Sequence, residues 1–91
     1  MAYQLVAGTG PVNVDLTTKG RRVASWAFSN ITAAAVINLR NGTVTGDKVI
    51  QVQLAVGASA SEAYGQVGIV FPLGVFVEIV TGTITGSIDL Y

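Results

Sequence analysis

The sequence contains neither histidine nor cysteine. Without cysteine, the chain has no disulfide bonds and no thiolate ligands for a metal ion. Without histidine, it lacks the side chain that most often acts as a general base and as a transition-metal ligand. Neither a Ser-His-Asp nor a Cys-His arrangement can be built, so we expect a protein that is not an enzyme and that needs no cofactor.

Charged residues are also scarce. They make up 11% of the chain, with five basic and five acidic residues and a formal net charge of +0, against roughly 25% in an average soluble protein. No basic stripe is present, which argues against nucleic acid as a partner. Because 51% of the residues are hydrophobic, we expect part of the surface to be buried against other subunits.

The few carboxylates show no spacing that identifies a catalytic pair or a metal site. A glycosidase needs two carboxylates in one cleft, and calcium usually needs a dense acidic loop. Neither pattern is present, so we expect no metal site. Glu78 lies inside an apolar segment, and we expect it to pair with an arginine.

Long hydrophobic runs are absent as well. No segment approaches the roughly 18 apolar residues of a membrane helix, and the first six residues do not have the pattern of a signal peptide. We therefore expect that the protein is made in a host cytoplasm and that it does not associate with a membrane. Gly8-Thr9-Gly10 has no accompanying lysine, so it indicates a turn and not a phosphate-binding loop.

Alternation of apolar and polar residues is the dominant pattern that remains. It predicts strands at Val12–Leu16, Arg21–Asn30, Lys48–Val56 and Thr83–Tyr91. Within the second of these, Trp26 shares one face with Phe28. Core packing is therefore favoured for Trp26 over a role as a stacking platform for a ligand.

Ala33–Arg40 is a further predicted strand, although its composition is mixed. Ala33–Arg40 begins with alanines that favour helix, but its end at Asn41-Gly42 favours a strand that forms a hairpin with the following segment. We predict a single all-β domain over residues 1–91, a β-sandwich or jelly roll of about seven to eight antiparallel strands with little or no helix. Residues 1–10 are a candidate extended N-terminal arm.

The segment from Gly68 to Gly82 holds two apolar runs around the turn residues Pro72-Leu73-Gly74. Nearly every position from Val75 to Val80 is apolar, which predicts that both faces of this strand are covered. One face would meet the core of the domain, and the other would meet a second sheet or another subunit. The predicted oligomer interface is Val75, Phe76, Val77 and Ile79.

Four segments of the chain resemble small all-β structural proteins of tailed bacteriophages, namely Val23–Asn30, Val36–Gly42, Val49–Gly57 and Gly68–Glu78. The resemblance implies a capsid cement or decoration protein on the outside of the virion. Such a protein forms a homo-oligomer, a trimer in preference to a dimer, and locks neighbouring major capsid protein subunits together. The arginines Arg21, Arg22 and Arg40 are the predicted contacts with the capsid.

An alternative function belongs to a different class of protein. A receptor-binding module of a phage tail or fibre tip would bind glycans on the host cell, with Trp26, Tyr64 or Tyr91 as stacking surfaces. Exposure of the tryptophan distinguishes this alternative from a structural role.

Overall fold

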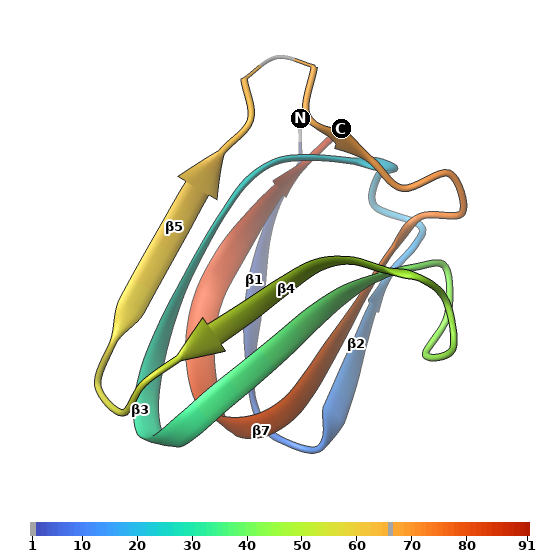
Figure 1. Ribbon diagram of the computed structural model, residues 1–91. Coiled ribbons are helices and arrows are strands. Elements are labelled where there is room, and N and C mark those ends of the chain that lie inside the picture. Colours follow the sequence, from blue (N-terminus) through green and yellow to red (C-terminus); the bar gives the residue numbers. More distant parts are fainter. Residues whose placement is uncertain (1, 66) are drawn as a thin grey trace.

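The computed structural model describes residues 2–65 and 67–91, and every regular element in these ranges is a β-strand. Figure 1 shows the strands in chain order. They are β1 (Ala2–Thr9), β2 (Val12–Leu16), β3 (Arg22–Asn41), β4 (Lys48–Leu54), β5 (Ser59–Ala63), β6 (Ile69–Val70) and β7 (Val75–Leu90). All of their pairings are antiparallel. The predicted all-β fold class is confirmed.

Two strands are longer than the sequence predicted. The segments expected as separate strands on either side of Ile31-Thr32 form the single strand β3 of 20 residues. The two segments on either side of Gly82 likewise form β7, which has 16 residues. β3 and β7 pair with each other over almost their whole length, so they form the central ribbon of the sheet.

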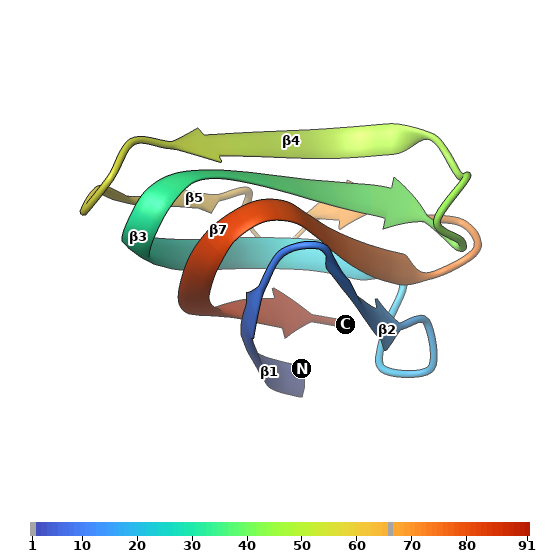
Figure 2. The ribbon, with the colours of Figure 1, turned by 90° about the horizontal axis from the view of Figure 1, so that it is seen from below.

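The central ribbon bends in its middle and folds the sheet into two layers (Figure 2). The first layer has the order β5-β3-β7-β1 and uses the first half of β3 and the last half of β7; the two-residue β6 pairs with the start of β3 on the same edge as β5. The second layer has the order β4-β3-β7-β2 and uses the other halves. Two four-stranded antiparallel layers connected in this way form a jelly roll.

The bend has a local cause in each strand. Pairing between β3 and β7 shifts register at several points from Asn30 to Ile37, and Ala33 has a positive φ of 52°. In β7 the bend falls at Gly82, whose φ of 82° lies in the region that favours glycine. These irregularities reverse the alternation: even-numbered residues of β3 face the core before its bend, and odd-numbered residues face it afterwards.

The core lies between the two layers. Trp26 is 7% exposed and stacks on Phe28 with their ring centroids 5.4 Å apart. The predicted core position of Trp26 is therefore confirmed. The other large side chains of the core are Val6, Leu16, Val23, Ile37, Leu39, Val52, Leu54, Phe71, Val75, Val77, Ile79, Ile84, Ile88 and Leu90.

The predicted oligomer interface is wrong for three of its four residues. Val75, Val77 and Ile79 are each 0% exposed, because the fold of the second layer onto the first covers them within the same chain. They offer no surface to a second subunit. Phe76 points to the opposite face of the strand and is half-buried there.

The N-terminal segment does not form a free arm. β1 pairs with β7 along its whole length, from Ala2 opposite Leu90 to Thr9 opposite Thr83. Val6, in the middle of β1, is 1% exposed and belongs to the core. β1 is therefore an edge strand of the first layer, and its first residue, Ala2, lies opposite Leu90 at the end of β7 (Figure 1).

Candidate interaction surfaces

The outer face of the first layer is built from small side chains. Every second residue of β3 and β7 in this layer points away from the core. The outward residues of β3 lie beside outward residues of β5, because β3 and β5 are paired. We call this surface the small-residue face, and define it by Ser25, Ala27 and Ser29 of β3, Ser59 and Ser61 of β5, and Thr85 and Ser87 of β7.

The small-residue face is hollowed. A broad, open depression of about 780 Å³ lies over it and reaches β1, where Tyr3, Leu5 and Ala7 line its margin. Tyr3 and Leu5 are 64% and 75% exposed, so two large side chains border a surface of small ones. Gly86 also lines the depression through its backbone; its position in the alternation directs a Cβ toward the core, where it would collide with Phe28 and with the Ala27 carbonyl oxygen.

Among the outward positions of this layer, only Asp89 carries a charge. Its Oδ2 accepts a hydrogen bond from the Ser25 hydroxyl at 3.0 Å, and it lies opposite Tyr3 on β1. Glu62 is also exposed on β5, but it pairs opposite Trp26 and so belongs to the other face of that strand. The hollow is therefore lined by hydroxyl and methyl groups that another surface can approach without removing water from a charge.

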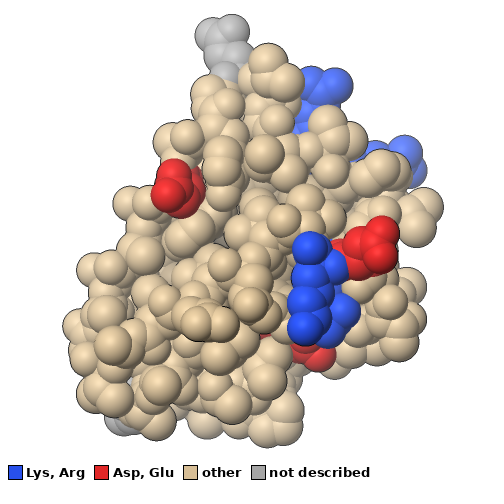
Figure 3. Space-filling view, in the orientation of Figure 1, with Lys and Arg blue, Asp and Glu red and all other residues tan. Residues whose placement is uncertain are grey.

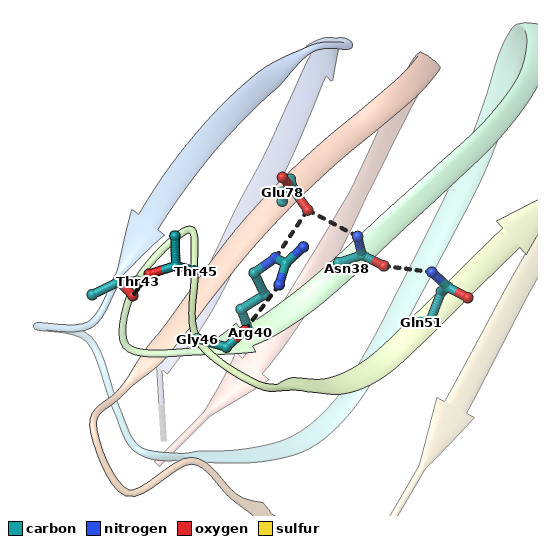
Figure 4. Close-up of polar contacts among 7 residues, drawn as sticks. All are labelled: Asn38, Arg40, Thr43, Thr45, Gly46, Gln51 and Glu78. Carbon is teal, nitrogen blue, oxygen red and sulfur yellow. Dashed lines mark hydrogen bonds and ion pairs between the residues drawn. The ribbon is translucent and has the colours of Figure 1, made fainter.

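The outer face of the second layer has a different character. Asn13, Glu78, Asn38 and Gln51 lie in register across β2, β7, β3 and β4. The last three are linked as Figure 4 shows: Gln51 Nε2 donates to Asn38 Oδ1 at 2.9 Å, and Asn38 Nδ2 donates to Glu78 Oε1 at 2.8 Å. Asn38 is only 2% exposed, so this row of polar groups satisfies a buried amide.

Arg40 completes this polar row, and its guanidinium is bonded within the chain. Its Nε lies 3.0 Å from Glu78 Oε1, and its Nη1 donates to the Gly46 carbonyl oxygen at 2.9 Å. The predicted pairing of Glu78 with an arginine is confirmed. The hydrogen bond from Asn38 and the guanidinium of Arg40 lower the pKa of the Glu78 carboxyl, while partial burial opposes that shift.

Arg21 and Arg22 differ from Arg40 in that both are exposed. They lie where β3 begins, at the end of the molecule opposite the bend, and Arg22 Nη1 donates to the Val67 carbonyl oxygen at 3.4 Å. Charges are few on the face that Figure 3 shows: blue and red groups occupy a few spots, and most of the visible surface is uncharged.

The aromatic residues proposed for glycan stacking have structural roles. Trp26 is buried, and its Nε1 donates to the Tyr64 hydroxyl at 2.8 Å. The Tyr91 hydroxyl donates to the Gly65 carbonyl oxygen at 3.3 Å. The exposed aromatic ring beside a hollow is Tyr3 instead, which sequence reasoning missed. The signal for it was the alternation of Tyr3, Leu5 and Ala7 along an uncharged segment.

The described ranges, 2–65 and 67–91, contain no group of three or more histidine, cysteine, aspartate or glutamate residues that could hold a metal ion. Nor do they contain a helix long and apolar enough to cross a membrane. No protein-family model, no curated protein and no solved structure matches this chain.

Proposed function

We propose that this chain is a non-enzymatic structural subunit of a virion, a capsid cement or decoration protein that braces neighbouring major capsid protein subunits. The observation that carries the proposal is the small-residue face, a hollowed and nearly uncharged sheet surface with exposed Tyr3 and Leu5 at its margin. The partners of the chain in this role are other copies of itself and the capsid shell.

The physical argument rests on the cost of desolvation. A protein surface that must be covered by another protein binds best where few charges lose their water. The cores of protein interfaces are depleted in charge and contain aromatic residues. The small-residue face, with Tyr3 beside it, has both properties.

Two further observations support a capsid setting. The jelly-roll arrangement of the strands occurs in many viral capsid domains, although it also occurs in lectins and other proteins. Four segments of the sequence resemble structural proteins of tailed bacteriophages. Arg21 and Arg22 remain candidates for capsid contact because they are exposed, whereas Arg40 is engaged with Glu78.

The test is co-sedimentation with capsid shells. Shells assembled from the major capsid protein encoded in the same genome, without decoration, are mixed with the purified chain. We expect the chain to pellet with the shells and to raise their melting temperature. A wild-type chain that stays in the supernatant contradicts the proposal.

A matched pair of variants locates the contact. Ala27 is exposed in the centre of the small-residue face, so Ala27→Glu adds a charge there without disturbing the core. We expect this variant to keep its circular dichroism spectrum and lose at least tenfold in shell affinity. Val56→Glu, which places the same charge at a 67% exposed position between β4 and β5, is the control and should bind as wild type does.

Glycan binding is a second candidate function, and the hollow itself favours it. Serine and threonine hydroxyls line its floor and an exposed tyrosine stands at its margin, which are groups that bind sugars. Titration with host-surface oligosaccharides, followed by NMR shifts of amides on β1, β3 and β7, tests this role. Tyr3→Ala should abolish the shifts if the tyrosine stacks on a sugar ring.

A further inference from the structure

The two layers have five edge strands, β1, β2, β4, β5 and the two-residue β6, and they are not equally protected. Edge strands expose unpaired backbone groups to which another strand can add, and soluble proteins usually guard them with charged residues, proline or short length. β2 carries Asp15, β4 carries Lys48 and β5 carries Glu62. β1 reads Ala-Tyr-Gln-Leu-Val-Ala-Gly-Thr, with no charged residue and no proline.

β1 is also the longest of the edge strands, with 8 residues. Within the part of the chain that the structure describes, it pairs with β7 alone, so its other side has no backbone partner. Leu5 is 75% and Tyr3 64% exposed, so both large side chains of this strand are open to solvent. β1 therefore has the properties of a strand that pairs with another strand.

The direction of the backbone groups follows from the pairing with β7. The Gly10 N–H donates to the Gly82 carbonyl oxygen at 2.9 Å, which continues the ladder of β1 with β7 by one step. Because backbone groups alternate in direction along a strand, even-numbered residues of β1 bond to β7. The N–H and C=O groups of Tyr3, Leu5 and Ala7 thus point to the free edge.

We propose that β1 pairs antiparallel with β1 of a second copy of this chain, about a twofold axis that passes beside Leu5. In this register Leu5 faces Leu5 of the second copy, and Tyr3 faces its Ala7. Each facing pair exchanges two backbone hydrogen bonds. The two first layers join into one continuous sheet, and their small-residue faces join into one longer surface.

A second copy fits this edge for two reasons. When two copies of one strand pair antiparallel, residues near the centre of the strand face each other. Charges of one sign at the centre would therefore repel each other. β1 carries none, and the proposed register sets the large Tyr3 against the small Ala7 and leucine against leucine. The contact is isologous, so it closes at two copies and leaves no free β1 edge.

This inference deepens the proposed structural role, because it rests on self-association and assigns the residues that make it. It also differs from the trimer that the phage resemblance implies, since pairing of two identical antiparallel strands closes as a dimer. The dimer would present two small-residue faces on the same side, which doubles the area available for contact with a shell.

Sedimentation equilibrium of the full chain and two variants tests the pairing. We expect wild type to have the mass of a dimer. Leu5→Lys should remain a monomer at concentrations at least tenfold above the wild-type dissociation constant, because two lysines would face each other. Val56→Lys, at a position of similar exposure away from β1, should stay a dimer. Circular dichroism and the melting temperature should show that both variants are folded.

A charge-reversal mixture makes the test specific to this register. Leu5→Glu alone should also be a monomer, whereas an equimolar mixture of Leu5→Lys and Leu5→Glu should form a dimer of two different chains. A wild-type monomer, a trimer, or a Leu5→Lys variant that retains the dimer mass each overturns the pairing. None of these results depends on capsid shells, so shell binding by a chain that lacks the β1 contact would leave the proposed function standing.

Discussion

The indole Nε1 of Trp26 donates a hydrogen bond to the hydroxyl oxygen of Tyr64 at 2.8 Å. Tyr64 directly follows β5, and its backbone N–H also donates to the Ala24 carbonyl oxygen at 2.8 Å. The chain after β5 is thus held to β3 by a side-chain and a backbone bond, one of which satisfies the polar group of a buried tryptophan.

Tyr64→Phe should therefore destabilise the protein. It removes the acceptor and leaves the Trp26 N–H unpaired in a largely buried position, which costs about 1–3 kcal/mol. Urea denaturation followed by the fluorescence of this single tryptophan measures the free energy of unfolding. Tyr91→Phe is the matched control, because the Tyr91 hydroxyl bonds at 3.3 Å on the exposed surface. If both variants lose the same free energy of unfolding, the hydrogen bond from Trp26 contributes no more than the exposed bond of Tyr91.

The Glu78 carboxyl should make stability depend on pH in the acid range. Its pKa is lowered by the hydrogen bond from Asn38 and by Arg40. The folded value therefore lies below the unfolded one, so the stabilisation is full above the ordinary value of about 4.5 and is lost as the pH falls through the folded pKa. Glu78→Gln should be less stable than wild type at neutral pH, with a flatter decline in acid.

Thermal unfolding from pH 7 to pH 3 by circular dichroism checks this expectation. Asp15→Asn is a useful comparison, since the pKa of the Asp15 carboxyl is lowered by the hydrogen bonds from Thr17. Asp15 is exposed on β2, so its replacement should change the acid profile less. Parallel pH profiles for wild type and Glu78→Gln would contradict the assigned role of Glu78.

Charged substitutions in β7 should separate its inner and outer faces. Val77 is 0% exposed, so Val77→Asp places an unpaired charge in the core and should prevent folding. Val80 is 37% exposed on the other face, so Val80→Asp should give a folded protein. The dispersion of amide signals in an NMR spectrum distinguishes the two outcomes. A folded Val77→Asp variant would restore the original assignment of this position to an interface.

Gly82→Ala should destabilise the bend of β7 by about 1–3 kcal/mol or more, since alanine is strained at a positive φ. Its Cβ would also lie 2.7 Å from the Ala35 Cβ. Gly57→Ala serves as the control, because Gly57 has a similar φ of 73° with nothing within 4 Å. The difference between the two free energies of unfolding measures the contact with Ala35, and equal values would show that only backbone strain matters.

Much of the fold could be predicted from local patterns. Alternation correctly set Trp26 and Phe28 on one face of β3. The Asn41-Gly42 turn correctly ended β3 before the hairpin with β4. These features are local because strand alternation has a period of two residues and because a turn needs only a few residues of suitable type.

The surfaces were much harder to predict. Arg40 was expected to contact another protein, and the fold pairs it with Glu78, which lies 38 positions away in sequence. The small-residue face combines residues of β3, β5 and β7 that are distant in the chain. No spacing along the sequence marks such a surface, because its members meet only through strand pairing.

The sequence by itself determined that this protein is all-β, that it lacks the side chains of the commonest catalytic and metal sites, and which residues of each short strand share a face. Only the tertiary structure decided which of those faces is inside. The bends near Ala33 and at Gly82 reverse the alternation within single strands. They therefore buried Val75, Val77 and Ile79 within one chain and left the small-residue face and the outer edge of β1 uncovered.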